Sequence, residues 1–293
     1  MARPGGGART RARRRIVAGC PKFVGNAAIP RYKSPHMQIV TLTTDFGLQD
    51  WFVGAMKGVI AGIAPDARVV DISHGIPYHD VRAGAFALMS TARYFPEGTI
   101  HVAVVDPGVG SERSAIAATG RGQVFIGPDN GLLSWAIGPG GADDIFRIEN
   151  PEIILADCSA TFHGRDIFAS AAAHLATGKP LTRLGPRRAD MIALRWPLTM
   201  ACTDGTIHGE VIYIDRYGNS VTNFENTLVR SKPSARLQLA DGMSAPIGDY
   251  YQSVPENEVV AVCGSTGYLE IAVNGGNASQ ALGLRVGDGV LLG

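Results

Sequence analysis

The pattern of apolar and polar positions changes once along the chain. From residue 38 to about residue 188, short β-branched runs alternate with longer segments in which apolar residues recur every three or four positions. The runs at 38–47, 68–74 and 99–106 predict buried strands, and the segments 52–65, 80–95 and 164–178 predict helices. Strands that alternate with helices are typical of a mostly parallel sheet with helices on its faces. This half of the chain is therefore predicted to be an α/β domain.

After residue 188 the helical periodicity disappears. Short β-rich runs at 205–224, 235–242, 258–276 and 285–293 are separated by Gly, Asn and Asp turns, which predicts a smaller, barrel-like all-β domain or a sandwich. We therefore expect four segments, namely a disordered basic extension at 1–36, the α/β N-terminal domain at 37–188, a linker at 189–198 and the all-β C-terminal domain at 199–293.

The composition is that of a soluble globular protein. The 293 residues are 45% hydrophobic and 18% charged, and the net charge of +1 gives no electrostatic reason to expect a nucleic-acid partner. The four cysteines show no CxxC spacing, so neither a zinc site nor a disulfide framework is indicated, and reduced thiols in the cytoplasm are expected. No apolar run approaches the roughly 20 residues that a membrane helix needs, and no membrane partner is expected.

The first 36 residues differ from the rest. No acidic residue occurs before Asp45, and "RTRARRR" at 9–15 is densely basic. This segment can be read as a targeting sequence, a basic arm, or an upstream extension that precedes a natural start at Met37. We favour a disordered, dispensable extension, because the segment has too little apolar content to fold.

Acidic residues recur where the predicted strands of the first domain end. They are Asp45, Asp71, Asp106 and Asp129, and three histidines (His74, His79 and His163) stand near them in the sequence. Open α/β sheets bind ligands at the carboxyl edge of their strands, so the set favours a site there. Arg113 follows Asp106 by seven residues. The pair alone is equally consistent with a surface ion pair, and His163 alone with a helix cap.

Two kinds of chemistry can use such a set. A metal ion bound by Asp and His ligands would supply hydroxide at neutral pH, but the sequence has no HxxH, HExxH or DxD spacing. In the metal-free alternative, a carboxylate beside a guanidinium stays ionised, and an imidazole nearby orients water or accepts its proton.

The second domain carries the stretch "IDRYGNSVTN" at 214–223. Its plain interpretation is a hairpin turn, since Gly-Asn suits one. Tyr250, Tyr251 and Tyr268 can be core aromatics of a barrel. Aromatics combined with Asn and glycine backbone are also the groups that stack on a purine and bind its edge.

Taken together, these stretches resemble a known family. The segments "TLTTDFG", "VVDISHGIPYHDVRAGA", "FPEGTIHVAVVDPGVGSER", "GPDNGLL", "TFHGRDIF", "IDRYGNSVTN" and "GYLEIAVN" are similar to those of the S-adenosyl-L-methionine hydrolases, also called SAM hydroxide adenosyltransferases. These enzymes are relatives of the synthases that make fluorinated and chlorinated adenosine. The resemblance covers residues 38 to 293 in order.

The resemblance implies a reaction and an assembly. Water or hydroxide attacks C5′ of S-adenosyl-L-methionine and yields adenosine and L-methionine, with no metal and no cofactor. The implied assembly is a homotrimer, with each site between the N-terminal domain of one subunit and the C-terminal domain of the next.

The resemblance also assigns roles to single residues. In the hydroxide-using branch an Asp, an Arg and a His hold the water, and Asp106, Arg113 and His163 match them. The implied substrate-binding residues are Asp45 for the ribose diol, Asp50 and Asp215 for the methionine amino group, Ser265 for its carboxylate, Asn219 for the adenine edge, Tyr217 and Tyr251 for the adenine faces, and Gly275. Thr266 and His79 depart from the fluoride-using enzyme, which has Arg and Trp there.

Besides the hydrolase, three functions stay open. The nearest is a halide-using 5′-halo-5′-deoxyadenosine synthase. In that branch a Tyr takes the place of Asp106 and, in the fluoride enzyme, a Ser that of Gly164. A carboxylate at ~4 Å would repel a halide by about 4 kcal/mol at an effective dielectric near 20, which favours water. The second and third are a metal-dependent hydrolase and a non-catalytic nucleoside-binding protein.

Overall fold

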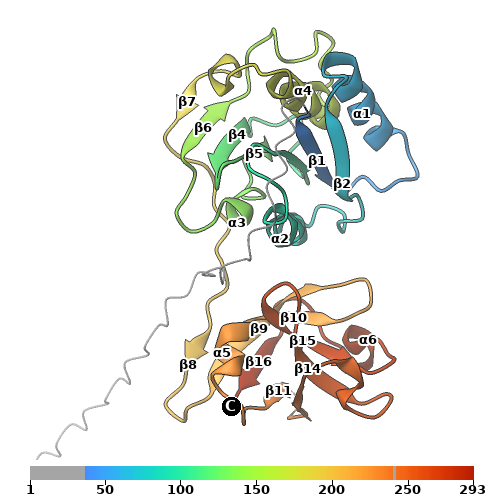
Figure 1. Cartoon of the computed structure of the whole chain (residues 1–293), viewed down its shortest axis with the longest axis vertical. Coiled ribbons are helices and arrows are strands. Elements are labelled where there is room, and N and C mark those ends of the chain that lie inside the picture. The colour runs from blue at the N-terminus through green and yellow to red at the C-terminus, as the bar shows by residue number, and fades with distance from the viewer. Residues whose placement is uncertain (1–36, 240–241) are drawn as a thin grey trace, which may run out of the picture. The chain divides into compact units, whose positions relative to one another are not determined.

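The computed structural model describes residues 37–239 and 242–293 (Figure 1). They fall into two compact units, and the division lies between Trp196 and Pro197. The predicted basic extension at 1–36 lies outside the described residues.

A seven-stranded sheet forms the centre of the first unit. In spatial order its strands are β2 (Arg68–Ser73), β1 (Ile39–Thr44), β3 (Ile100–Val104), β5 (Gln123–Pro128), β4 (Ala115–Gly120), β6 (Asp144–Arg147) and β7 (Arg187–Arg188). The pairs from β2 to β5 are parallel, and the pairs from β5 to β7 are antiparallel. The predicted α/β class is therefore confirmed, with a sheet that is parallel in one half only.

The antiparallel half was not foreseen because its strands carry a weak signal. β4 reads AIAATG, and alanine and glycine have little intrinsic preference for strands. Its pairing with β5 depends on a two-residue turn at Arg121 and Gly122, whose φ angles of 54° and 71° suit a type I′ hairpin.

Helices cover both faces of this sheet (Figure 1). On one face lie α1 (Phe52–Ile63), the π-helical turn η1 (Gly164–Ala169) and its continuation α4 (Ser170–Ala176). Met56 and Ile60 of α1 and Phe168 of η1 pack there against Val40 and Leu42 of β1. On the other face α2 (Val81–Ala92) packs against α3 (Ser134–Ile137). The short 3-10 helix η2 (Leu181–Arg183) precedes β7.

The second unit contains a nearly closed sheet whose strand pairs are antiparallel except for the last, so the prediction of an all-β, barrel-like domain is confirmed. The strand order is β12 (Ser244–Ala245), β11 (Leu237–Leu239), β16 (Gly289–Leu292), β9 (Ile207–Ile214), β10 (Ser220–Glu225), β15 (Tyr268–Val273), β14 (Val259–Cys263) and β13 (Ile247–Gly248), with β8 (Met200–Ala201) beside β9. Only short helices interrupt it, namely α5 (Asn226–Arg230), α6 (Ala278–Leu282) and the 3-10 turn η3 (Tyr251–Ser253). Val211, Phe224, Leu269 and Val290 belong to its core.

Candidate active site

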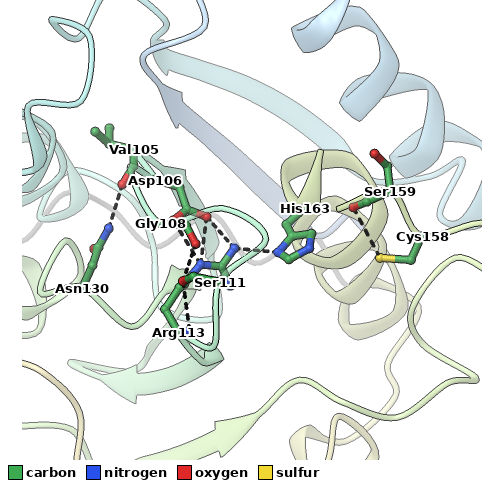
Figure 2. A network of polar contacts seen from close by, with 9 residues as sticks. All are labelled: Val105, Asp106, Gly108, Ser111, Arg113, Asn130, Cys158, Ser159 and His163. Carbon is green, nitrogen blue, oxygen red and sulfur yellow. Dashed lines mark hydrogen bonds and ion pairs between the residues drawn. The ribbon is translucent and has the colours of Figure 1, made fainter. Parts of the chain in front are cut away.

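Asp106 lies at the carboxyl edge of the first sheet, two residues after β3 ends. The Arg113 guanidinium donates to both carboxylate oxygens, with Nε 3.0 Å from each and Nη2 2.5 Å from Oδ2. The two side chains are only 5% and 10% exposed, so this is not a surface ion pair. Asn130 of the motif "GPDNGLL" donates its amide to the Val105 carbonyl beside it, which holds the strand end in place (Figure 2).

The turn between these two residues brings them together. The Val109 amide donates to the Asp106 carbonyl, and Ser111 donates through its hydroxyl to the Gly108 carbonyl and accepts from the Arg113 amide. Gly110 has φ +78°, and a Cβ there would lie 2.6 Å from the Ala160 carbonyl oxygen. The glycine is therefore required both by its backbone conformation and by the close approach of the loop that carries His163.

His163 completes the group from a different part of the chain. Its Nδ1 lies 2.7 Å from Arg113 Nη2 (Figure 2). Arginine only donates hydrogen bonds, so Nδ1 accepts, and the neutral imidazole carries its proton on Nε2. His163 immediately precedes η1, but its side chain makes no capping hydrogen bond, so the cap interpretation is wrong. Arg113 is thus the central member, with the acid on one side and the imidazole on the other.

The surroundings favour the neutral form of His163. Burial is the main cause that lowers its pKa, and the Arg113 charge lowers it further, while the charges of Asp106 and Asp166 oppose both effects. Since the imidazole stays neutral, Nδ1 remains available as the acceptor for Arg113.

The loop before His163 is anchored by Asp166, a residue that the sequence analysis did not single out. Asp166 is fully buried, accepts a hydrogen bond of 2.8 Å from the Ser159 amide, and lies 2.5 Å from Arg165 Nε. The available signal was its position three residues after His163 in the motif "TFHGRDIF".

Asp45 is half-buried at the end of β1. Its Oδ2 accepts a hydrogen bond of 2.9 Å from the His79 amide, and His79 adopts φ +61° to make it. This contact uses the His79 backbone, and the His79 ring stacks on Tyr78, with centroids 3.7 Å apart. The His79 backbone therefore orients Asp45. Asp50 is exposed in the loop before α1.

An aromatic cluster joins the loop after Asp45 to the loop of His163. The rings of Phe46, Phe52 and Phe162 lie with centroids 5.2 to 6.0 Å apart. Gly164 contributes space, since a Cβ there would lie 3.1 Å from the Phe46 ring. The segments carrying Asp45 and His163 are thereby packed together.

The two other candidate acids hold chain segments in place, and Asp71 lies inside β2 rather than at a strand end as predicted. Asp71 pairs with Lys57 at 2.6 Å and lies 3.1 Å from Nε2 of His74, whose Nδ1 contacts the Thr44 hydroxyl. Burial acts to raise the pKa of Asp71, but Lys57 and His74 outweigh it and lower that pKa. Asp129 pairs with Arg188 and accepts from the Ile192 amide. Both carboxylates are engaged within the fold.

In the second unit, Asp215 and Asn219 build the turn between β9 and β10. Oδ1 of Asp215 accepts from the Tyr217 and Asn219 amides, both at 2.9 Å, and Oδ2 accepts from the Asn219 side chain at 3.0 Å. The plain interpretation as a hairpin turn therefore describes the backbone. The same contacts fix the orientation of the buried Asn219 amide, while the Tyr217 side chain is 76% exposed.

Tyr251 lies in η3 and is 44% exposed. Its hydroxyl donates to Oε1 of Glu270, a buried acid in the middle of β15 that the sequence analysis missed. The signal was a carboxyl group inside the otherwise apolar stretch "GYLEIAV".

Ser265 and Gly275 flank β15 at its two ends. Ser265 is exposed in the turn before the strand, where Thr266 is half-buried, and Gly275 has φ +74° in the turn after it. The six-residue strand between them extends about 20 Å, so these two candidates are not brought together.

Over the described ranges 37–239 and 242–293, no three His, Cys, Asp or Glu side chains gather as they would around a metal ion. None of the helices in these ranges is long and apolar enough to cross a membrane.

Comparison with known proteins covers nearly the whole described chain. The family model of the SAM hydroxide adenosyltransferase N-terminal domain matches residues 40–185, and that of the C-terminal domain matches residues 209–291. An (R)-S-adenosyl-L-methionine hydrolase from Thermus thermophilus is 44% identical over 87% of this chain and 100% of its own length. A fluorinase from Nocardia brasiliensis is 29% identical over 86% of this chain and 95% of its own.

A solved structure agrees with these matches. The crystal structure of a conserved protein from Thermotoga maritima superposes with a TM-score of 0.78, at 35% identity, and covers 87% of this chain and 100% of its own. The chain belongs to the SAM hydroxide adenosyltransferase family.

Proposed function

We propose that this protein hydrolyses S-adenosyl-L-methionine to adenosine and L-methionine. The observation that carries the proposal is the buried arrangement of Asp106, Arg113 and His163 in a chain of this family. All three come from segments that carry the resemblance. The Arg113 guanidinium contacts the Asp106 carboxylate and also a ring nitrogen of His163.

The reaction needs no acid for its leaving group. The oxygen of water attacks C5′ of the substrate, the C5′–S bond breaks, and its electron pair passes to the sulfonium sulfur. Methionine leaves as a neutral thioether, and the proton that the attacking water loses passes to bulk solvent. Catalysis therefore consists of removing the nucleophile from bulk solvent, aiming it and stabilising its hydroxide character.

The contacts of Arg113 indicate which of these tasks Asp106, Arg113 and His163 each perform. Its hydrogen bond to Nδ1 leaves the Nε2 proton of His163 to donate to the nucleophilic oxygen. The guanidinium charge acts on that oxygen only through space, because Nδ1 and Nε2 lie on opposite sides of the imidazole ring. Asp106 orients Arg113 through three hydrogen bonds. In this scheme His163 orients the nucleophile as a donor and does not accept its proton at Nδ1.

The remaining candidates bind the substrate in this proposal. The Asp45 carboxylate, oriented by the His79 amide, accepts from the ribose diol. Asn219 binds the adenine edge with an amide that Asp215 orients, and Tyr217 and Tyr251 stack on the base. The other assignments that stand as proposals are Asp50 and Asp215 for the methionine amino group, Ser265 for its carboxylate, and Gly275.

We further propose that the protein is a homotrimer in which neighbouring subunits complete each site. Its first unit exposes Leu48, Trp51 and Tyr78 by 74%, 71% and 79%, on the loops next to Asp45. Its second unit exposes Tyr217 by 76% beside Asn219. Large apolar side chains gathered around candidate site residues support a surface that a neighbour covers.

Subunit sharing can be tested by complementation. We expect Asp106→Ala and Asn219→Ala, each inactive alone, to regain partial activity when refolded together, because mixed trimers hold some sites with neither change. A sample in which one chain carries both changes and its partner carries Asp106→Ala is the control, and it has no intact site. Mixtures that form trimers but stay inactive would place the whole site in one subunit.

The ion pair between Asp106 and Arg113 weakens one argument against the halide-using alternative. The Arg113 charge compensates Asp106, so the net repulsion of a halide is far below the value for an isolated carboxylate. The preference for water then depends on the greater similarity to hydrolases than to fluorinases.

Product analysis tests the proposal directly. The protein is incubated with the separated R and S sulfonium epimers of S-adenosyl-L-methionine, because the name of the Thermus thermophilus relative specifies R. We expect adenosine and methionine from the R epimer, with or without chloride and after exhaustive chelation. Chlorinated adenosine would favour the synthase, loss of activity on chelation a metal enzyme, and adenosine binding without turnover a nucleoside-binding protein.

A further inference from the structure

Glu270 places a carboxyl group inside an otherwise apolar strand. Every residue of β15 is buried, and Glu270 in its middle is only 7% exposed. Its partners on the adjacent strands are Val221 of β10 and Val262 of β14. A carboxyl group in such a place destabilises a fold unless it is hydrogen-bonded, so its presence calls for a specific partner.

That partner is Tyr251. The tyrosine hydroxyl donates to Oε1 of Glu270, while 44% of the residue remains exposed. The backbone around Tyr251 is a three-residue 3-10 turn, which restrains a side chain less than a strand does. The hydrogen bond therefore fixes the far end of a ring whose near end is carried by a short turn.

The carboxyl group itself has little freedom. Gly264 lies so close that a Cβ there would be 2.5 Å from Glu270 Oε2. Burial raises the pKa of Glu270, the hydrogen bond from Tyr251 opposes this, and the Asp215 charge adds to the increase. Asp215 is the residue that orients Asn219, so the Glu270 carboxyl group lies within electrostatic range of the turn that carries Asn219.

We propose that Glu270 is a positioning residue that holds the Tyr251 ring in the plane in which it stacks on adenine. This inference rests on the proposed function, because it assigns Tyr251 to the base. Glu270 does not touch the reacting atoms, so its loss weakens binding of the nucleoside and leaves the chemical step intact. The expected signature is a change in KM and in adenosine Kd at constant kcat.

Four variants test the inference. Glu270→Leu removes the acceptor, Glu270→Gln keeps one, Tyr251→Phe removes the donor, and Tyr94→Phe is the control at a tyrosine of the first unit that is 52% exposed. We expect Glu270→Leu and Tyr251→Phe each to raise adenosine Kd and KM about tenfold, which is the loss of one hydrogen bond to a charged group. Glu270→Gln should restore most of the affinity, and the pair Tyr251→Phe/Glu270→Leu should be no worse than either single change.

The outcomes separate this inference from the proposed function. If the unaltered protein binds adenosine but Tyr251→Phe leaves Kd unchanged, or if the two changes add, Glu270 does not act through Tyr251. Should Glu270→Leu fail to fold, Tyr251→Phe and Glu270→Gln still decide. A protein that neither binds adenosine nor turns over S-adenosyl-L-methionine overturns the proposed function and this inference together.

Discussion

Arg113→Met is the most informative single change in the first unit. It removes every contact between Arg113 and Asp106 and leaves a carboxylate whose side chain is 5% exposed without its cation. Breaking a buried ion pair from one side costs about 3–5 kcal/mol of unfolding free energy. For a unit of this size a loss of 1 kcal/mol lowers Tm by about 2–4 °C, so we expect a decrease of about 6–20 °C.

A double variant separates stability from catalysis. Asp106→Leu/Arg113→Met replaces both charges by apolar side chains and should recover most of the lost stability, since uncharged replacements of a buried pair are often neutral or stabilising. Hydrolysis should not recover, because the Nε2 tautomer of His163 and the guanidinium charge are both lost. Arg113→Lys keeps a charge without the planar fork, and we expect at least a 10²-fold loss of kcat from misplacement alone.

Thermal and urea unfolding, followed by circular dichroism, measure the stability of each variant, and product release measures its activity. A cost below 1 kcal/mol for Arg113→Met would show that the pair is solvated in solution. A double variant as unstable as the single one would show that Arg113 stabilises the unit through other contacts, such as the Phe168 ring beneath its guanidinium. Full activity in Arg113→Lys would show that the planar guanidinium is not needed to hold Asp106 and His163 in place.

Three further predictions follow from single sites. Asp106→Ala and His163→Ala should each abolish most hydrolysis and leave adenosine binding within a few-fold, and parallel loss of both in calorimetry would contradict their assignment to the nucleophile. Gly110→Ala should lower activity and stability together, because φ +78° and the Ala160 carbonyl at 2.6 Å exclude a Cβ; wild-type melting and turnover would contradict this. Burial lowers the pKa of His101 to about 4 from 6.5, so stability should be full above pH 6.5 and fall by up to about 3 kcal/mol toward pH 4, a slope that His101→Gln should reduce in urea unfolding.

The sequence predicted the elements with a strong hydrophobic periodicity and missed the strands that form only by pairing with a neighbouring strand. Alternating strands and amphipathic helices placed β1, α1, β2, α2 and β3 correctly. The alanine-rich β4 and the four-residue β6 have no pattern of their own and become strands through the hairpin that follows β4. Local signals therefore identified the parallel half, and tertiary pairing decided the rest.

The candidate site shows a similar division. Asp45, Asp71, Asp106 and Asp129 look alike in the sequence, because each stands in or directly after an apolar, β-rich stretch. The fold distinguishes them through partners that are distant in the sequence. Asp129, for example, pairs with Arg188, which lies 59 residues further along the chain. Glu270 and Asp166 were missed because a single acid in an apolar stretch has no sequence pattern; only burial and contacts reveal it.

The contacts of Arg113 bear on the choice of nucleophile. A carboxylate has about four lone-pair positions, and Arg113 occupies three of those of Asp106, one on Oδ1 and two on Oδ2. One acceptor position on Oδ1 is left over, as are the two Nη1 protons of Arg113 and the Nε2 proton of His163. Water suits a site that offers both acceptors and donors, whereas a halide ion only accepts and would leave the carboxylate position unmatched. Hydrogen-bond complementarity thus adds support to the proposed preference for water even though the Arg113 charge compensates Asp106, and chloride should act as neither substrate nor strong inhibitor.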